Sequence, residues 1–361
     1  MTQMFVTLAI CATLLFVCPT ISNAENIKTP LFVFGDSLYD IGMSFYSDVE
    51  GAGAKHWPYG EHYFNIPVGR YSDGLVIPDF IAKFADLDPL QPYLVPRINS
   101  YANGINFASS NACVLTETCV EAINLKMQLH YFVQMVQNLT QQVGKSEANR
   151  HLSKAVYLFN IGADDYVTLF QTTLKKRPLS FYDKNLYMKQ ILGNLTVHIK
   201  TIYNQGGRKF AFQNVGPIGC MPSVKYTLDF NGTCAQEPQE LARMHNAAFS
   251  AVAKRLLSEL PGFKYSIYDF YVALHQRVLY GNTYGFKESE IACCGSGAFN
   301  GDYSCQMEDR TFSLCNSLND YLWFDARHPT HKANHQFAKE FWSGGPDVVA
   351  PYNLHNLFAM P

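Results

Sequence analysis

The sequence predicts an α/β fold in which helices cover both faces of a central parallel sheet. Short apolar segments of strand length alternate along the chain with longer segments whose apolar residues recur at helical spacing. The chain has 361 residues, of which 48% are hydrophobic and 16% are charged. A chain of this length and composition can bury a large core and has no compositional sign of disorder.

Four apolar segments are expected to be the strands. The first, PLFVFG, ends at a glycine, and the second, KAVYLFNIG, ends just before two adjacent carboxylates, Asp164 and Asp165. The strands are therefore expected at residues 30–35, 154–162, 209–216 and 264–271. Polar residues that follow such strands lie at the carboxyl edge of the sheet, where open parallel sheets bind their ligands.

Four longer segments have the apolar spacing of amphipathic helices. Gly144 closes the second of them and a Gly-Gly pair closes the third, and glycine is a common helix stop. The helices are expected at residues 73–87, 124–144, 188–207 and 237–260. Segments 43–72 and 279–323 are rich in Gly, Tyr and Cys and are expected to be irregular.

The N-terminus has the pattern of a secretory signal peptide. An apolar run, MFVTLAICATLLFV, precedes SNA, which places small residues at the −3 and −1 positions of a cleavage site after Ala24. We therefore expect a signal peptide over residues 1–24 and a single domain over residues 25–361, since no repeat or linker divides the rest. An N-terminal membrane anchor is the alternative, but the run is shorter than the ~20 residues that span a bilayer, and no other segment is long and apolar enough.

The cysteines and the sequons also indicate a protein that is secreted or lies in the endomembrane lumen. Eight of the ten cysteines follow residue 24, and an even number fits disulfides in an oxidising compartment. We expect Cys113 to pair with Cys119, and Cys220 with Cys234. The remaining four are expected to pair among themselves in one of three ways: Cys293, Cys294, Cys305 and Cys315. N-x-S/T sequons for glycosylation occur at Asn138, Asn194 and Asn231.

The charge and the motif content argue against several other functions. The formal net charge is −2, from 28 basic and 30 acidic residues, and no basic cluster is present, so nucleic acid is not an expected partner. No pair of C-x₂-C units indicates zinc. His331 and His335 could share a metal, but without an H-E-x-x-H sequence they are better explained as solvated residues of a helix face. No metal or cofactor is therefore expected, and the sequence indicates no particular protein partner.

Ser37 directly follows the first expected strand and its glycine, in FVFGDSLYD. At the start of a helix there, its hydroxyl would face the ligand-binding edge of the sheet. The alternative is an ordinary helix N-cap, a role that Ser performs well, and for Ser37 taken alone this explanation is favoured. The surrounding residues do not form the G-x-S-x-G turn of the α/β-hydrolases.

A second group of polar residues lies near the C-terminus, in WFDARHPT. Pro329 is expected in the first turn of a helix, which places His328 at the helix start and Asp325 three residues upstream in a loop. A carboxylate at this spacing can accept a hydrogen bond from the imidazole Nδ1–H and leave Nε2 free to take a proton from a serine. The alternative is a surface histidine with an unrelated aspartate nearby.

Ser37, Asp325 and His328 together resemble the catalytic triad of the GDSL family of esterases and lipases, in the SGNH-hydrolase superfamily. The resemblance is closest to the secreted plant branch and covers nearly the whole chain after residue 24. VFGDSLYDIG resembles the first family block, and FDARHPT resembles the last. Landmarks of the plant branch lie between them in the right order: WPYG, VGRYSDGLVIPDFIA, GINFAS, IGADDY, NVGPIGCMP and CCGSG.

The resemblance implies a flavodoxin-like three-layer α/β/α sandwich. It also implies a serine esterase or lipase that hydrolyses carboxylic esters through an acyl-serine intermediate, with a small ester or lipid as substrate. In this family three donors stabilise the oxyanion: the Ser backbone N–H, a Gly backbone N–H and an Asn side-chain amide. Ser37 would supply the first. Asn111 stands at the Gly position, and because Asn tolerates a left-handed backbone, its N–H would still point toward the substrate.

The third family block departs most from the pattern. It usually reads G-x-N-D, and here Asp164 stands where the amide donor belongs, while Asp165 is expected to be a structural acceptor. The first block departs as well, with Met43 where the family usually has Asn. An ionised carboxylate cannot donate, and it would repel the oxyanion by roughly 4 kcal/mol at ~4 Å and an effective dielectric constant of about 20.

Three interpretations follow from this departure. In the first, a working esterase keeps Asp164 protonated in an apolar pocket, where it can donate; Asp164→Asn would then raise turnover about 10²–10³-fold. In the second, an acyltransferase uses the same acyl-serine with an alcohol in place of water. In the third, the protein is a non-catalytic binding or modifier protein, as in myrosinase-associated members of the plant branch. Because Ser37 and His328 are both retained, the esterase is favoured and the silent protein is the main alternative.

Overall fold

A six-stranded sheet forms the middle layer of the protein. The structure, a computed structural model, describes residues 28–47, 53–170 and 179–361, so the expected signal peptide lies outside the described residues. The strands follow the spatial order β2-β1-β3-β4-β5-β8. They are β1 (Leu31–Gly35), β2 (Gly104–Asn106), β3 (Val156–Asn160), β4 (Lys209–Gln213), β5 (Lys264–Tyr268) and β8 (Val349–Ala350). The first five run parallel and β8 runs antiparallel to β5, which confirms the expected parallel sheet.

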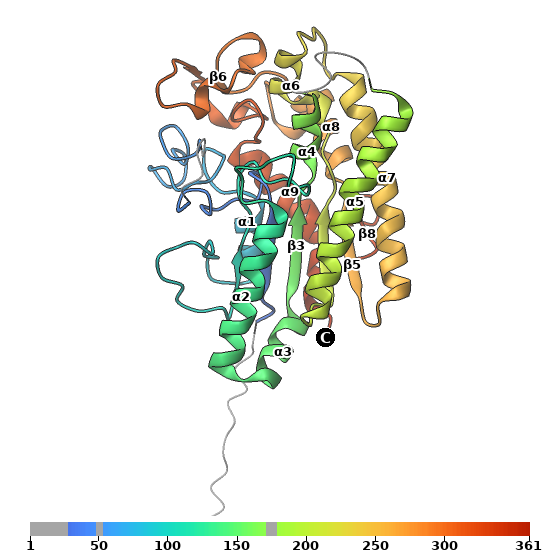
Figure 1. Cartoon of the computed structure of the whole chain (residues 1–361). Coiled ribbons are helices and arrows are strands. Elements are labelled where there is room, and N and C mark those ends of the chain that lie inside the picture. Colours follow the sequence, from blue (N-terminus) through green and yellow to red (C-terminus); the bar gives the residue numbers. More distant parts are fainter. Residues whose placement is uncertain (1–27, 48–52, 171–178) are drawn as a thin grey trace, which may run out of the picture.

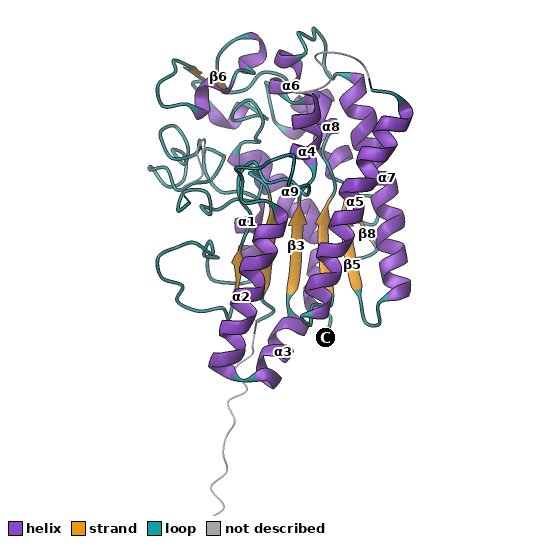
Figure 2. Cartoon of the chain, in the orientation of Figure 1, coloured by secondary structure: helices purple, strands orange, loops and turns teal. Residues whose placement is uncertain are grey.

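Helices cover both faces of this sheet, as Figures 1 and 2 show. The helices on one face are α2 (Leu125–Val143), α5 (Phe181–Asn204) and α7 (Gln236–Glu259). Those on the other face are α1 (Ile77–Phe84), α8 (Phe270–Leu279) and α9 (His331–Ser343). Shorter helices complete the fold: α3 (Lys145–Lys154), α4 (Ala163–Leu169), α6 (Pro222–Thr227) and α10 (Leu354–Ala359). The three-layer α/β/α sandwich is therefore confirmed. None of the helices in the described ranges is long and apolar enough to cross a membrane.

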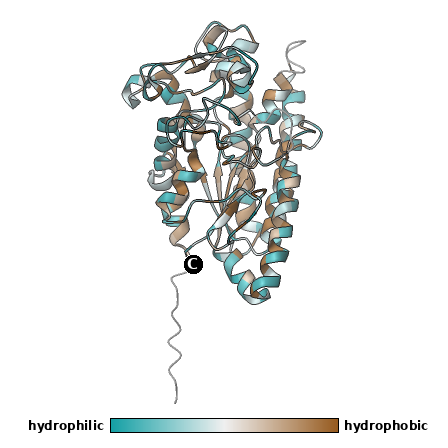
Figure 3. Cartoon of the chain, turned by 90° about the vertical axis from the view of Figure 1, so that its left-hand side faces the viewer, coloured by the Kyte–Doolittle hydropathy of each residue, from teal (hydrophilic) through white to brown (hydrophobic). Residues whose placement is uncertain are grey.

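The central strands β1 and β3 are almost wholly apolar because helices cover both of their faces. Every residue of β1 and β3 is buried. Phe34 stacks between Phe107 and Phe159, with ring centroids 5.1 and 5.0 Å from its own. Figure 3 shows hydrophobic strands between helices that carry both hydrophobic and hydrophilic residues. This core holds the carboxyl ends of β1 and β3 side by side.

Capping residues explain where elements differ from their expected ranges. α5 begins well before residue 188, because the Ser180 side chain caps it by accepting a hydrogen bond from the backbone N–H of Asp183 at 3.1 Å. The last expected strand stops before residue 271, because Asp269 caps α8 in the same way. The sequence reading missed β2 and β8, since strands of three and two residues are too short to show a periodicity.

Four disulfides join the cysteines of the described ranges: Cys113–Cys119, Cys220–Cys234, Cys293–Cys315 and Cys294–Cys305. The first two are the pairs that the sequence suggests, and the last two represent one of the three pairings that the sequence left open. The last two fasten an irregular segment around a small hairpin of β6 (Cys294–Gly295) and β7 (Ser313–Leu314). Cys294 and Cys305 pack with Tyr59, Tyr71 and Phe324 in a second small core, next to the loop that carries Asp325.

Candidate active site

Ser37, His328 and Asp325 form a continuous chain of hydrogen bonds at the carboxyl edge of the sheet. The Ser37 Oγ lies 2.7 Å from the Nε2 of His328, and the Nδ1 of His328 lies 2.7 and 2.8 Å from the two carboxylate oxygens of Asp325. All three residues are buried. The structure thus brings the three residues together in the order serine, imidazole, carboxylate, in which the imidazole can take a proton from the serine hydroxyl.

Ser37 lies in a tight turn at the end of β1. The Asp36 N–H donates to the carbonyl oxygen of Asn160 at the end of β3, and the Asp36 carboxylate accepts from the N–H of Leu38 at 3.0 Å. The residues that follow form turns and bends, and no helix begins at Ser37. The helix-capping explanation of Ser37 is therefore wrong, because the strand leads into a turn that points the hydroxyl toward His328.

Asp325 and His328 lie in a turn that precedes α9. The backbone N–H of Phe324 donates to the carbonyl oxygen of His328 at 2.7 Å and closes this turn. α9 itself begins at His331, with Thr330 as its N-cap, so the expectation that Pro329 occupies the first helical turn is wrong. The closed turn directs the Asp325 carboxylate back onto the imidazole, which is why a spacing of three residues brings them into contact.

Asp325 receives hydrogen bonds from more donors than the sequence suggests. The Tyr59 hydroxyl donates to its Oδ2 at 2.7 Å, the Gln306 amide donates at 3.2 Å, and the backbone N–H groups of Arg327 and His328 donate to its Oδ1. Burial alone would raise the pKa of Asp325, but the charge and hydrogen bond of His328 and the Tyr59 hydroxyl lower it to about 2. The sequence reading missed Tyr59 and Gln306; the WPYG landmark was the one signal that could have indicated Tyr59.

Tyr59→Phe is expected to lower kcat for ester hydrolysis roughly 10- to 100-fold with little change in KM. The substitution removes one hydrogen bond to a buried charged carboxylate, and such bonds contribute roughly 1.5–3 kcal/mol. Steady-state kinetics with a short p-nitrophenyl ester measure this effect. Tyr39→Phe is the matched control, since its buried hydroxyl donates to Gln213 at 2.9 Å and does not contact Asp325. Equal kcat values for the two variants would contradict a role for Tyr59 in positioning Asp325.

The backbone N–H groups of Ser37 and Asn111 are the two backbone donors that the family resemblance assigns to the oxyanion. Asn111 has a φ of +57°, the left-handed conformation expected at this position, and its side chain is exposed. Within the described ranges, no hydrogen-bond acceptor lies within reach of the N–H of Asn111 or of Ser37. Both groups are therefore free of hydrogen-bond acceptors in the part of the chain that the structure describes. Met43, the departure in the first block, is a buried core residue.

The two adjacent carboxylates of α4 have different partners. Asp165 accepts hydrogen bonds from the backbone N–H groups of Val114 and Leu115 at 2.8 and 3.0 Å, and burial raises the pKa of Asp165 to about 7. It is thus a structural acceptor for the loop that follows Asn111. Asp164 instead meets the guanidinium of Arg327, with 3.1 Å between its Oδ1 and Nη1. The expectation of an apolar pocket around Asp164 is wrong, because a cation stands against the carboxylate.

His331 and His335 contribute to packing on α9. The Nδ1 of His331 accepts a hydrogen bond from the backbone N–H of Leu75 at 2.9 Å, and both imidazole rings contact Phe80. Burial lowers the pKa of His331 to about 4. His331 is therefore half-buried and hydrogen-bonded, which differs from the solvated residue that was expected, while His335 is exposed. Among the described residues, the one cluster of possible metal ligands includes Cys220 and Cys234, whose sulfurs form a disulfide.

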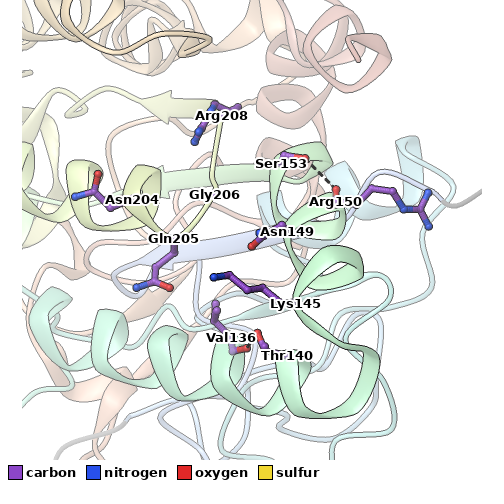
Figure 4. Close-up of a pocket in the computed structure, with 10 residues that line it drawn as sticks. All are labelled: Val136, Thr140, Lys145, Asn149, Arg150, Ser153, Asn204, Gln205, Gly206 and Arg208. Carbon is purple, nitrogen blue, oxygen red and sulfur yellow. Dashed lines mark hydrogen bonds between the residues drawn. The ribbon is translucent and has the colours of Figure 1, made fainter.

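An open pocket with a volume of about 630 Å³ lies away from these residues (Figure 4). It is lined by the end of α2, by α3 and by the turn after α5, at the edge of the sheet opposite to Ser37. Lys145, Arg150 and Arg208 give it a positive lining. Arg150 forms an ion pair with Glu147, and Arg208 donates to backbone carbonyl oxygens. Both guanidinium groups therefore already have partners within the protein. We therefore assign this pocket no part in the chemistry at Ser37.

Comparisons with known proteins agree with this geometry. The sequence profile of the family described as GDSL-like lipase/acylhydrolase matches residues 31–341. The chain is similar to a GDSL lipase of Tanacetum cinerariifolium, with 40% identity over 353 residues that cover 97% of this chain and 93% of that protein. It is similar to GDSL esterase/lipase 1 of Arabidopsis thaliana, with 40% identity over 95% of this chain and 93% of that protein. An Arabidopsis thaliana protein named inactive GDSL esterase/lipase-like protein 25 is 34% identical over 95% of this chain and 76% of its own length.

Proposed function

Because the chain belongs to the GDSL-like lipase/acylhydrolase family, we propose that it is a secreted carboxylic ester hydrolase that forms an acyl intermediate on Ser37. The observation that carries this proposal is the contact of 2.7 Å between the Ser37 Oγ and the Nε2 of His328. Asp325 holds the other imidazole nitrogen, so the tautomer that accepts a proton at Nε2 is the one in place.

The first half of the reaction acylates the enzyme. The Ser37 Oγ attacks the carbonyl carbon of the ester while its proton passes to the Nε2 of His328. The backbone N–H groups of Ser37 and Asn111 donate to the oxyanion of the tetrahedral intermediate. Asp325 stabilises the imidazolium that forms. The intermediate collapses when the ester oxygen leaves as an alcohol, taking the proton from the Nε2 of His328.

The second half releases the acid. A water molecule gives a proton to the Nε2 of His328 as its oxygen attacks the acyl carbon, and the same two N–H groups donate hydrogen bonds to the oxyanion. The bond to the Ser37 Oγ then breaks, Oγ recovers the proton, and the carboxylic acid leaves. No redox step and no cofactor is required by this sequence of proton transfers.

Labelling by a fluorophosphonate combined with turnover of a short p-nitrophenyl ester tests the proposal. A hydrolase is expected to react covalently at Ser37, to lose activity in proportion to labelling, and to release p-nitrophenol continuously. Mass spectrometry of the labelled peptide identifies the modified serine. Absence of both labelling and turnover would reject the proposal and favour a binding protein.

The Asp164 carboxylate is the observation that favours an alternative to ester hydrolysis. It stands at the position where the family resemblance places an amide donor. A relative named inactive favours a catalytically silent binding protein as one alternative, and an acyltransferase is the other. An acyltransferase would use the same acyl-serine with an alcohol in place of water. In that case the fluorophosphonate still labels Ser37, p-nitrophenol is released mainly when an acceptor alcohol is added, and the product is a new ester.

We further propose that the protein enters the secretory pathway. Four disulfides support an oxidising compartment, and all three sequon asparagines are exposed: Asn138, Asn194 and Asn231. Expression of the full chain in plant cells is expected to yield a secreted protein whose N-terminus is Glu25 and whose mass falls on treatment with an endoglycosidase. A protein retained in the cytosol with residues 1–24 intact would contradict this proposal.

A further inference from the structure

Two buried polar atoms, on Asp164 and on the residue before His328, have no hydrogen-bond partner among the described residues. They are the Oδ2 of Asp164 and the Nε of Arg327, which belong to the two side chains of one ion pair. Buried polar groups in folded proteins are nearly always satisfied, and leaving one unsatisfied costs about 1–3 kcal/mol. The Nε–H of Arg327, on the residue before His328, is therefore a donor that a bound ligand could satisfy with an acceptor atom.

The ion pair joins the start of α4 to the residue before His328, the histidine that contacts Ser37. Gly35 and Asn160 are paired across β1 and β3, so the turn that holds Ser37 and the start of α4 leave the sheet side by side. Asp164 is in the first turn of α4, and Arg327 immediately precedes His328. Burial and then the charge of Asp164 raise the pKa of Asp36, the residue before Ser37, and the charge of Arg327 opposes them.

The surroundings hold the guanidinium in place and keep it charged. The Tyr303 ring lies against it, with 5.4 Å between the Arg327 Cζ and the ring centroid. Burial would lower the pKa of Arg327, but Tyr303 and Asp164 raise it. Arg327 and Asp164 are both largely buried, with side chains 12% and 11% exposed, so their charges balance within the site. The pair therefore adds no net negative charge where an oxyanion would form.

We propose that the Arg327 guanidinium donates the third hydrogen bond to the oxyanion, in place of a side-chain amide, and that Asp164 is the residue that positions it. This inference rests on the proposed esterase function. The Nε–H supplies the donor that the carboxylate of Asp164 cannot supply. A charged, fixed donor that acts on a developing negative charge contributes chiefly to the transition state, so its removal lowers kcat more than it changes KM.

Kinetics of three variants test the inference with a short p-nitrophenyl ester. Arg327→Ala is expected to lower kcat by about 10²–10³-fold or more, with KM changed only a few-fold, because a donor is lost and Asp164 is left unpaired. Asp164→Asn is expected to leave kcat within about tenfold of the wild type, because a donor is already present. The double variant is expected to recover to within about tenfold of the wild type, since the asparagine amide supplies the donor without a charge.

The outcomes separate this inference from the proposed function. A wild type that neither labels nor turns over rejects both. If the wild type is active, three results would each reject the proposed role of Arg327 and leave the esterase function intact. In the first, Arg327→Ala changes only KM or nothing. In the others, Asp164→Asn raises turnover by the full 10²–10³-fold, or the double variant stays as slow as Arg327→Ala. Arg243→Ala is the control, since this exposed arginine donates to the Tyr271 hydroxyl away from the site. Thermal unfolding checks the fold of each variant. If Arg327→Ala does not fold, the kcat of the double variant still tests the inference.

Discussion

Ser37→Ala is expected to lower kcat for ester hydrolysis by roughly 10⁶-fold, the largest effect of any substitution in this protein. The alanine has no nucleophilic oxygen, so no acyl-enzyme can form even though His328 and Asp325 remain in contact. The fold should persist, because Ser37 lies in a turn at the strand end and its side chain bonds only to His328 within the described ranges. Circular dichroism and thermal unfolding are therefore expected to match those of the wild type.

Ser223→Ala is the matched control for this prediction. Ser223 is also a buried serine, and its backbone N–H donates to the carbonyl oxygen of Ala326, close to the loop that carries Asp325. Its hydroxyl has no partner among the described residues, so its loss should change kcat less than about threefold. If Ser37→Ala keeps more than about one hundredth of the wild-type kcat, Ser37 is not the nucleophile.

Asp325→Asn is expected to lower kcat by about 10⁴-fold, the second largest effect. Tyr59, Gln306 and the N–H groups of Arg327 and His328 all donate to this carboxylate, so an amide NH₂ placed among them would oppose other donors. The amide also cannot stabilise the imidazolium that forms when His328 takes the Ser37 proton. The variant should therefore hold His328 in an unproductive tautomer while Ser37 remains intact.

The pH dependence of the wild type follows from the same carboxylate. The contacts with His328 and Tyr59 hold the pKa of Asp325 at about 2, below the ordinary pKa of an aspartate in an unfolded chain. Its ionisation therefore stabilises the fold above that ordinary pKa, and this contribution is lost as pH falls toward 2. Asp325 is then ionised throughout the neutral pH range in which the reaction is measured. The control for Asp325→Asn is Asp269→Asn, which keeps the cap of α8 and is expected to have the kcat of the wild type. A kcat for Asp325→Asn within tenfold of the control would contradict the proposed triad.

Local sequence patterns were sufficient for most of the sheet and for part of the site. β1, β3, β4 and β5 appear as short runs rich in apolar residues, because strands buried on both faces have mostly apolar side chains. Asn124 and Gly144 bound α2 within one residue of the expected range, because caps act on backbone groups only a few positions away. The contact between Asp325 and His328 is local in the same sense, since three residues separate them.

The remaining features of the site depend on how the layers pack. Ser37 and His328 are 291 positions apart, and their contact exists because β1 and the loop before α9 reach the same edge of the sheet. Tyr59 reaches Asp325 from a separation of 266 positions, out of a segment that showed no regular pattern. In the sequence alone, Asp164 indicates the loss of a hydrogen-bond donor. The ion pair with Arg327 is the basis for our proposal that Asp164 positions a different donor, the guanidinium. Hydrogen bonds and ion pairs between distant residues leave no periodicity in a sequence, because they are made only when tertiary packing brings the two side chains together.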